Sequence, residues 1–410
     1  MVWQNDGMKK LILSGILISL CSVLFAQKRP SRESMRRLVA EDLEFSVKQY
    51  KSLMRILPAG KMPKTYDAKA DTLATSDSDW WCSGFYPGTL WYLYEYSSDA
   101  AIKREAETRM AIIKHEATDS SNHDLGFKIF CSFGNAYRVT GRQEYKQTVL
   151  TAAKSLASRY HPSIRSIQSW DSSAMYRCPV IIDNLMNLEL LEWSSKNGGA
   201  KQFGDIAVNH ANTTLKNHFR PDYSSFHLVD YDLSTGKVMR RITRQGAADS
   251  SAWSRGQAWG LYGYTMMYRF TKNTRYLSQA AHIAKFILDH PRLPSDKIPY
   301  WDFDAPGIPN TYRDASAAAV MASAFLELGK YTKGQSRIQY IATAEKIIQV
   351  LSSPAYLAKL GTNGGFLLKH SVGALPFKSE VDVPLTYADY YFVEALIRYK
   401  NWYLKEPGKI

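Results

Sequence analysis

Two aspartates lie where a carboxylate can take part in catalysis. The first, Asp124, belongs to a His-Asp-Leu-Gly-Phe segment at 123–127 that leads into a helical stretch. An aspartate at that place also accepts hydrogen bonds from the amides of the first helical turn. On spacing alone helix capping is the more frequent role, so capping and catalysis stay open as two interpretations.

The second aspartate, Asp183, lies in a strongly apolar segment that Pro179 opens. Ile181, Leu185 and Leu188 follow at the i, i+4, i+7 spacing of one helix face, which predicts a helix that starts at the proline. Burial disfavours the charged form of a carboxyl group and raises its pKa unless a partner compensates. A carboxyl group that keeps its proton near neutral pH suits a general acid. The alternative is a structural aspartate bonded to a neighbouring loop.

Arg255 and Trp259 are one helical turn apart and share a helix face. An indole beside a guanidinium forms a floor on which an acidic sugar can stack while the arginine reaches its carboxylate or sulfate. A cation–π pair that closes a helix end is an equally frequent structural alternative. The nearby Arg313-Asp314 pair, followed by Ser316, predicts a salt-bridged helix start.

The composition favours an anionic partner. The 410 residues carry a formal net charge of +14, and 45% of them are hydrophobic, which is typical of a globular protein. The basic residues are dispersed and not gathered in one stripe, which argues against nucleic acid. Fragments of an anionic polysaccharide fit better, and a merely basic surface is the alternative. Cys82, Cys131 and Cys178 have neither metal-ligand spacing nor an even count, so we expect no metal site and no disulfide framework.

The N-terminus has the order of a secretory signal peptide. Lys9 and Lys10 precede an apolar run from Leu11 to Phe25, and Ala26 supplies a small residue for cleavage. The apolar run is shorter than the roughly 20 residues that cross a bilayer, which argues against a membrane anchor. We therefore predict a signal peptide over residues 1–26, with residues 1–7 as an upstream extension. The expected location is the periplasm of a Gram-negative bacterium, without insertion into a membrane.

The remaining chain, 27–410, is expected to form one all-α domain. Apolar residues recur at helical spacing over 133–160, 259–288 and 317–351. Segments 137–145 and 268–276 look like two copies of a helix–turn–helix unit, and a looser third copy begins at Leu328. Stacked hairpins of this kind form either an open solenoid or a closed ring. Loops rich in Gly, Pro, Trp and Asp favour the closed barrel. The sequence also predicts one β-hairpin, which joins 226–231 to 237–242 on the face of the barrel that carries the long loops.

These motifs together resemble the unsaturated glucuronyl hydrolases, glycoside hydrolase family 88. The matching segments are 80–88, 123–127, 182–187, His227, Gln245, 251–259, 301–304, 313–314 and 389–396. The resemblance implies an (α/α)6 barrel of six helical hairpins and a catalytic pair formed by Asp124 and Asp183. It also implies substrate contacts from Trp170, His227, Gln245, Arg255 and Trp259, and no cofactor.

The reaction that the resemblance implies is hydration of a vinyl ether. The substrate would be a glycosaminoglycan fragment, made by a lyase, whose terminal uronate has a C4=C5 double bond. We expect Asp183 to be the proton donor and Asp124 to stay ionised, with pKa values set apart from one another. The alternatives are an unsaturated rhamnogalacturonyl hydrolase that acts on pectin fragments, a sugar epimerase with paired histidines, and a non-catalytic protein that binds anionic oligosaccharides. The particular glycosaminoglycan, its sulfation and the oligomeric state are left open.

Overall fold

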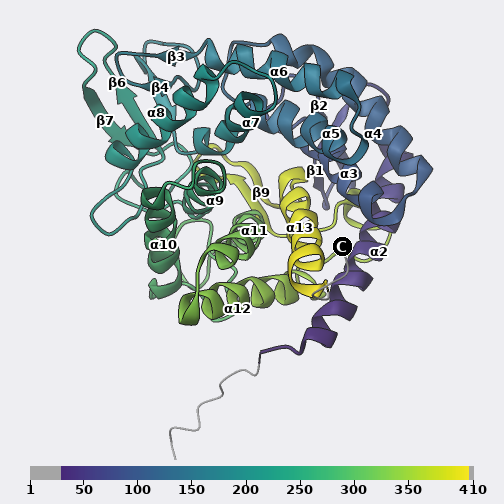
Figure 1. The fold of residues 1–410 in the computed structure, drawn as a ribbon. Coiled ribbons are helices and arrows are strands. Elements are labelled where there is room, and N and C mark those ends of the chain that lie inside the picture. Colours follow the sequence, from purple (N-terminus) through teal and green to yellow (C-terminus); the bar gives the residue numbers. More distant parts are fainter. Residues whose placement is uncertain (1–28, 406–410) are drawn as a thin grey trace, which may run out of the picture.

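The helices form two concentric rings, seen end-on in Figure 1. The computed structural model describes residues 29–405. The outer ring consists of α2 (Arg32–Ile56), α4 (Ala100–Ile113), α6 (Gln143–Ala157), α8 (Gln202–Asn217), α10 (Thr274–Asp289) and α12 (Gly334–Leu351). The inner ring consists of α3 (Phe85–Ser97), the π-helix η2 (Gly126–Gly134) with its continuation α5 (Asn135–Thr140), α7 (Asn184–Lys196), α9 (Ser254–Thr271), α11 (Ala315–Tyr331) and α13 (Thr386–Tyr399). Outer and inner helices alternate along the chain, and α13 packs against α3 to close the ring. The predicted (α/α)6 barrel is confirmed.

The two rings differ in how their helices are buried. Outer helix α10 buries a single stripe that includes Tyr276, Ala280, Ile283 and Ile287, as expected for a helix with one solvated face. Inner helices α11 and α13 are buried on all sides, α11 from Ala315 to Gly329. Small side chains on α11 allow this close packing, because an inner helix must fit between the barrel interior and the outer ring.

The repeated helix–turn–helix units are also confirmed. α5 ends at Thr140 and Gly141 adopts a left-handed conformation before α6, while Lys272 does the same between α9 and α10. The first predicted helical stretch, 133–160, is not one helix: it contains the end of η2, then α5, and then α6. The π-helix η2 precedes α5, and such π-turns are frequent at functional sites.

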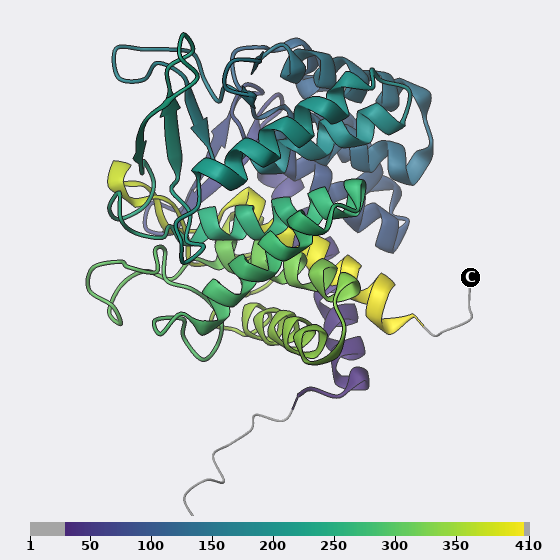
Figure 2. The ribbon, with the colours of Figure 1, turned by 60° about the vertical axis from the view of Figure 1, so that its left-hand side comes forward.

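The strands lie with the long loops at one end of the ring (Figure 2). In the described part of the chain, three of the four antiparallel sheets have two strands: β1 (Met62–Asp67) with β2 (Thr72–Ser76), β3 (Tyr160–His161) with β4 (Ser166–Ile167), and β8 (Ser371–Ala374) with β9 (Ser379–Val383). The predicted hairpin is confirmed as β6 (Leu228–Tyr231) and β7 (Val238–Ile242), and β5 (Pro179–Ile181) adds a third strand to it. The helix predicted to begin at Pro179 begins instead at Asn184, because the backbone of 179–181 pairs with β6.

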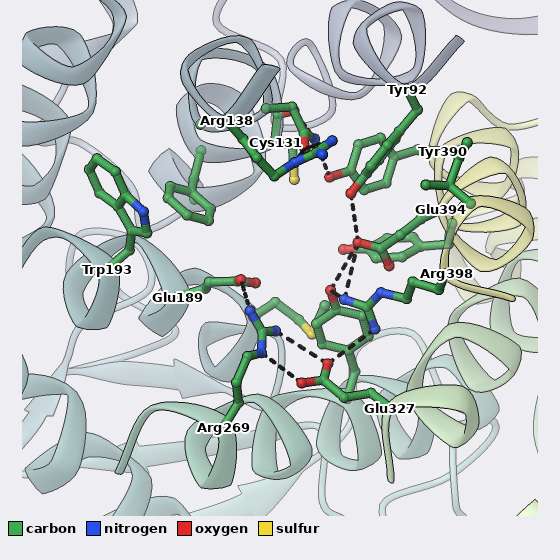
Figure 3. A pocket seen from close by; sticks show the side chains of 18 of the residues that line it. Tyr92, Cys131, Arg138, Glu189, Trp193, Arg269, Glu327, Tyr390, Glu394 and Arg398 are labelled. Carbon is green, nitrogen blue, oxygen red and sulfur yellow. Dashed lines mark hydrogen bonds and ion pairs between the residues drawn. The ribbon is translucent and has the colours of Figure 1, made fainter. Parts of the chain in front are cut away.

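The opposite end of the barrel holds a cavity of about 500 Å³ near the C-terminal ends of the inner helices (Figure 3). Arg269 pairs there with Glu189 at 2.5 Å and with Glu327 at 2.6 Å. Arg398 pairs with Glu327 at 3.1 Å and with Glu394 at 3.3 Å. These ion pairs join α7, α9, α11 and α13. Each of these carboxylates is matched by a cation, and removal of one partner would leave a buried charge unpaired at a high cost in stability.

None of the helices in residues 29–405 is long and apolar enough to cross a membrane. The predicted signal peptide lies outside the described residues.

Candidate active site

The two aspartates lie at the N-terminal ends of neighbouring inner helices, at the end of the ring that carries the loops. Asp124 leads into η2, and Asp183 directly precedes α7. The two helices approach closely at Gly126, where a Cβ atom would lie 2.6 Å from Oδ1 and 2.7 Å from Cα of Asn187. The Phe127 amide donates to that same Asn187 Oδ1 at 3.0 Å. A glycine and an asparagine thus bring the two carboxylates together.

Neither carboxylate serves as a helix cap. No backbone amide of the described chain donates to the Asp124 carboxylate, and the Asp183 side chain makes no capping hydrogen bond. The two side chains are 17% and 12% exposed, so each keeps a small face open to solvent. Oδ2 of Asp183 is buried without a hydrogen-bond partner among residues 29–405. A buried, unpaired carboxylate oxygen is costly to maintain, and a functional role is the usual explanation.

One histidine stands beside each aspartate. His227 Nδ1 accepts the backbone amides of Arg244 at 3.1 Å and Gln245 at 3.2 Å, so the ring proton is assigned to Nε2. That Nε2 lies 3.7 Å from Asp183 Oδ2. On the other side, His123 Nε2 lies 3.4 Å from Asp124 Oδ1. Burial lowers the pKa of His227 to about 3, so this ring is a neutral N–H donor that faces a carboxylate.

Burial raises the pKa of both aspartates to about 7. The charge of Asp183 raises the pKa of Asp124 further, and Lys128 opposes this increase. Arg255 and the indole N–H of Trp259 lower the pKa of Asp183. Both carboxyl groups therefore hold protons more tightly than a free aspartate. When one of two nearby carboxyl groups ionises, its charge raises the pKa of the other, so the pair loses its two protons in separate steps and keeps one of them near neutral pH.

Arg255 is occupied by contacts within the protein. It is 1% exposed, and its guanidinium contacts Asp314 at 3.2 Å and the carbonyl oxygens of Val372 at 2.5 Å and Gly373 at 2.6 Å. Its cation–π contacts are with Trp253 and Tyr387. The predicted pairing of Arg255 with Trp259 is therefore wrong, because Arg255 turns toward the loop that contains Gly373. Asp314 does cap α11 through the Ser316 amide, as predicted for that helix start.

Trp259 is fully buried between Phe127 and Tyr391, so its ring is not an open floor for a sugar. Its indole nitrogen has no hydrogen-bond partner in the part of the chain described, although it lies close enough to lower the pKa of Asp183. The tryptophan was predicted to offer its ring face to a sugar, but it instead directs its indole N–H toward the Asp183 carboxylate.

The other two predicted contacts lie around this centre. Gln245 donates through Nε2 to the Gly373 carbonyl at 3.1 Å. Trp170 forms an isolated β-bridge with Asn122, two residues before Asp124. The structure thus brings Asp124, Asp183, His227 and Trp259 together, places Trp170 and Gln245 beside them, and uses Arg255 to hold the loop. Sequence reasoning missed the role of His123, although it stands directly before Asp124 in the quoted motif.

No group of three or more His, Cys, Asp or Glu side chains within 29–405 is arranged to hold a metal ion. Cys82, Cys131 and Cys178 are free.

Comparisons of the sequence and the fold with known proteins identify the family of this chain. A scan against models of known protein families gives no match. An unsaturated glucuronyl hydrolase from Formosa agariphila is 44% identical over 349 residues, which are 85% of this chain and 86% of that protein. An unsaturated chondroitin disaccharide hydrolase from Streptococcus pyogenes serotype M1 is 33% identical over 82% of this chain and 85% of its own. The crystal structure of an unsaturated glucuronyl hydrolase specific for heparin is 46% identical, with a TM-score of 0.86 over 89% of this chain and 97% of that one. The chain belongs to the unsaturated glucuronyl hydrolases, the enzymes of glycoside hydrolase family 88.

Proposed function

We propose that this enzyme removes the terminal Δ4,5-unsaturated uronate from lyase-generated glycosaminoglycan oligosaccharides, with Asp183 as the proton donor and Asp124 as its partner. The observation that carries this assignment is the pair of buried carboxyl groups, both with a pKa of about 7, at the N-terminal ends of adjacent inner helices. Such a pair holds a proton and a negative charge at the same time near neutral pH.

The reaction proceeds by hydration of the double bond. Asp183 transfers its proton to C4, and positive charge develops on C5 and the ring oxygen. The ionised Asp124 stabilises that charge. Water then adds its oxygen to C5 and returns a proton to Asp183, which gives a hemiketal. The hemiketal opens to a C5 ketone, and the resulting hemiacetal at C1 releases the remaining sugar as an alcohol.

Asp183 is assigned as the donor because of its surroundings. Its Oδ2 has no hydrogen-bond partner in the described chain, so a proton on this oxygen is free to be transferred. The neutral His227 N–H at 3.7 Å faces the same oxygen and favours the carboxylate that remains after the transfer.

Among the substrates, unsaturated disaccharides from heparin are proposed as the first choice. The solved relative at 46% identity is described as specific for heparin, whereas the streptococcal relatives named for chondroitin disaccharides are 33% identical. The positive net charge of this chain supports a sulfated substrate in either case.

Loss of the ultraviolet absorbance of the unsaturated uronate tests the proposal. Purified protein is mixed separately with lyase-generated disaccharides from heparin, chondroitin, hyaluronan and pectin. We expect turnover of a glycosaminoglycan product that Asp183→Asn abolishes. Asp171→Asn is the control, because the Asp171 side chain is 78% exposed and its one ion pair within residues 29–405 is with Arg159. Turnover of the pectin product alone would instead favour the rhamnogalacturonyl hydrolases, and an active Asp183→Asn variant would refute the assignment of the donor.

Export to the periplasm is part of the same proposal, on the strength of the signal-like order of residues 1–26. Fractionation of a Gram-negative host that expresses the full chain tests it. Activity released with the periplasmic fraction, together with a mature N-terminus near Gln27, is the expected result. Activity that stays with the cytoplasm or the membrane would contradict it.

A further inference from the structure

Arg244 carries a positive charge that no acidic group of the described chain matches. Its guanidinium carbon lies 5.0 Å from the centre of the Trp170 ring, 5.7 Å from that of Tyr176 and 5.3 Å from that of Phe377. No hydrogen bond or ion pair from this guanidinium is formed within residues 29–405. Aromatic faces hold the plane of an arginine but leave its N–H edge free, and that edge is the part that binds a carboxylate or sulfate.

The arginines around it have partners. Arg240 stacks on the same Tyr176 ring at 5.1 Å, but it also pairs with Asp230 at 3.4 Å. Arg177 pairs with Asp232 at 3.0 Å. Arg241 donates to the Asn217 carbonyl at 2.8 Å. Arg241 likewise has no acidic partner, but its guanidinium is held by a carbonyl oxygen. Of these four arginines, Arg244 is the one whose guanidinium makes neither an ion pair nor a hydrogen bond within residues 29–405.

The backbone of Arg244 is fixed beside the catalytic pair. Its amide donates to His227 Nδ1 at 3.1 Å, and the opposite edge of that ring faces Asp183. Trp170, on which the guanidinium stacks, is bridged to Asn122 on the Asp124 side. The positive charge of Arg244 also acts on the site electrostatically. Burial is the main cause of the lowered pKa of His227, and the charge of Arg244 lowers it further. Arg244 thus connects both sides of the site.

The position of Arg244 points to the second sugar of the substrate. An enzyme that removes a terminal uronate must bring C4 and C5 of that ring to Asp183, which is 12% exposed. Arg244 is half-buried, and Phe377 in the cluster around it is 55% exposed. The cluster is therefore more exposed than the carboxylates, and the rest of a saccharide whose terminal ring reaches Asp183 must extend from there toward solvent.

We propose that Arg244 is a specificity-determining residue that binds a sulfate on the sugar attached to the unsaturated uronate. This inference rests on the proposed function, because it needs the terminal uronate at the Asp124–Asp183 pair. Trp170, Tyr176 and Phe377 orient the guanidinium, whose N–H edge then meets the sulfate oxygens. The sulfate supplies the negative charge that the protein lacks at this place.

The test is a binding measurement that does not depend on turnover. Calorimetric titrations compare Asp183→Asn with the double variant Asp183→Asn/Arg244→Met. The ligands are unsaturated disaccharides from heparin and chondroitin in pairs that differ only by one sulfate. Methionine keeps an apolar stem among the aromatic rings, and the backbone donor to His227 remains. The matched control is Arg240→Met in the same background, because Arg240 stacks on the same ring but has its own acidic partner.

For at least one sulfate position, we expect Arg244→Met to reduce the affinity ratio of sulfated to unsulfated ligand by roughly 10- to 100-fold, the range for loss of a charge-assisted hydrogen bond. Arg240→Met should preserve that ratio. An unchanged ratio in every pair, or an equal loss for both members of each pair, would overturn the assignment of Arg244. Failure of the proposed function is separate from this, since it would show as absence of turnover by the wild-type enzyme.

Discussion

His227 Nε2 lies 3.7 Å from Asp183 Oδ2, and both atoms are buried without a hydrogen-bond partner in the described part of the chain. The separation exceeds the roughly 3.2 Å limit of a good N–H···O bond. The donor and acceptor therefore face one another with their hydrogen-bonding capacity unused. The two amides at Nδ1 fix the position of the imidazole, so this spacing is set by the protein. It leaves Oδ2 of the proposed proton donor without a competing hydrogen bond from the described chain.

The two nitrogens of His227 are expected to have separable roles. In His227→Asn the side-chain oxygen can still accept the Arg244 and Gln245 amides, but the donor toward Asp183 is lost. We expect a fall in kcat of roughly 10- to 100-fold, with stability nearly retained. Steady-state kinetics and thermal melts measure the two effects.

His227→Gln is the complementary variant, because a glutamine can reach toward Asp183 but cannot replace Nδ1. It leaves two partly buried amides without their acceptor and should lose roughly 1 kcal/mol of stability for each of them, the low end of the cost of an unsatisfied buried group. Equal effects of the two variants on both kcat and stability would contradict this division of roles.

The activity should decrease as the pH rises above about 7. Both carboxyl groups have a pKa raised to about 7, and the mechanism needs one of them protonated. Deprotonation of the pair removes the donor, so kcat/KM should fall tenfold for each pH unit on the alkaline side. A pH profile with the preferred disaccharide measures this. Full activity up to pH 9 would exclude a shared carboxyl proton.

Asp183 should also make the folded protein less stable as the pH rises. Its pKa is about 7 in the folded state and 3.8 as an unperturbed group, so the folded state binds the extra proton between pH 4 and 7. Stability is lost across that window, by about 4 kcal/mol at most. Asp183→Asn removes the effect and should therefore unfold at higher denaturant concentration than wild type at pH 8, but at a similar concentration at pH 4. A stability difference that does not change between these pH values would contradict the raised pKa.

Arg255 is expected to matter for stability as well as for activity. Arg255→Met leaves the buried Asp314 carboxylate without its cation and the Val372 and Gly373 carbonyls without their donor. Breaking a buried pair in this way costs about 3–5 kcal/mol. Chemical denaturation measures the loss. A variant of unchanged stability whose KM alone increases would show that Arg255 acts only as a substrate contact.

The close approach at Gly126 predicts a strong effect of a single methyl group. In Gly126→Ala the new Cβ would meet the backbone of Asn187 at 2.7 Å, so η2 and α7 must separate and move the aspartates apart. Overpacking of this kind costs about 1–3 kcal/mol, and kcat should fall further than stability accounts for. Gly204→Ala on the outer helix α8 is the control, since its nearest neighbour is the Ser195 hydroxyl at 3.1 Å, on a side chain that can rotate. Similar losses of kcat in both variants would contradict the proposed role of Gly126.

The amino-acid sequence was sufficient to predict the fold and the family, and it singled out Asp124 and Asp183 as the pair now proposed to be catalytic. Helical periodicity and the repeated turns at Gly141 and Lys272 predict stacked hairpins, because these signals are local and each helix carries its own pattern. The quoted motifs around Asp124 and Asp183 are contiguous segments, so they too can be recognised without the structure.

Only the tertiary structure decided which groups meet. On spacing alone, helix capping was the more frequent role for Asp124. The structure argues against capping, because no backbone amide of residues 29–405 donates to the Asp124 carboxylate, and the catalytic role stays our proposal. The pairing of Pro179–Ile181 with β6, which delays the start of α7 to Asn184, is likewise a long-range contact. The contacts of Arg255 are also long-range. Its spacing along the helix favours a contact with Trp259, but its guanidinium binds the carbonyl groups of Val372 and Gly373 and the Asp314 carboxylate. The spacing of residues along a helix predicts only which side chains of that helix are neighbours. A buried charged side chain, by contrast, needs hydrogen-bond and ion-pair partners in place of water, and these can come from any part of the fold.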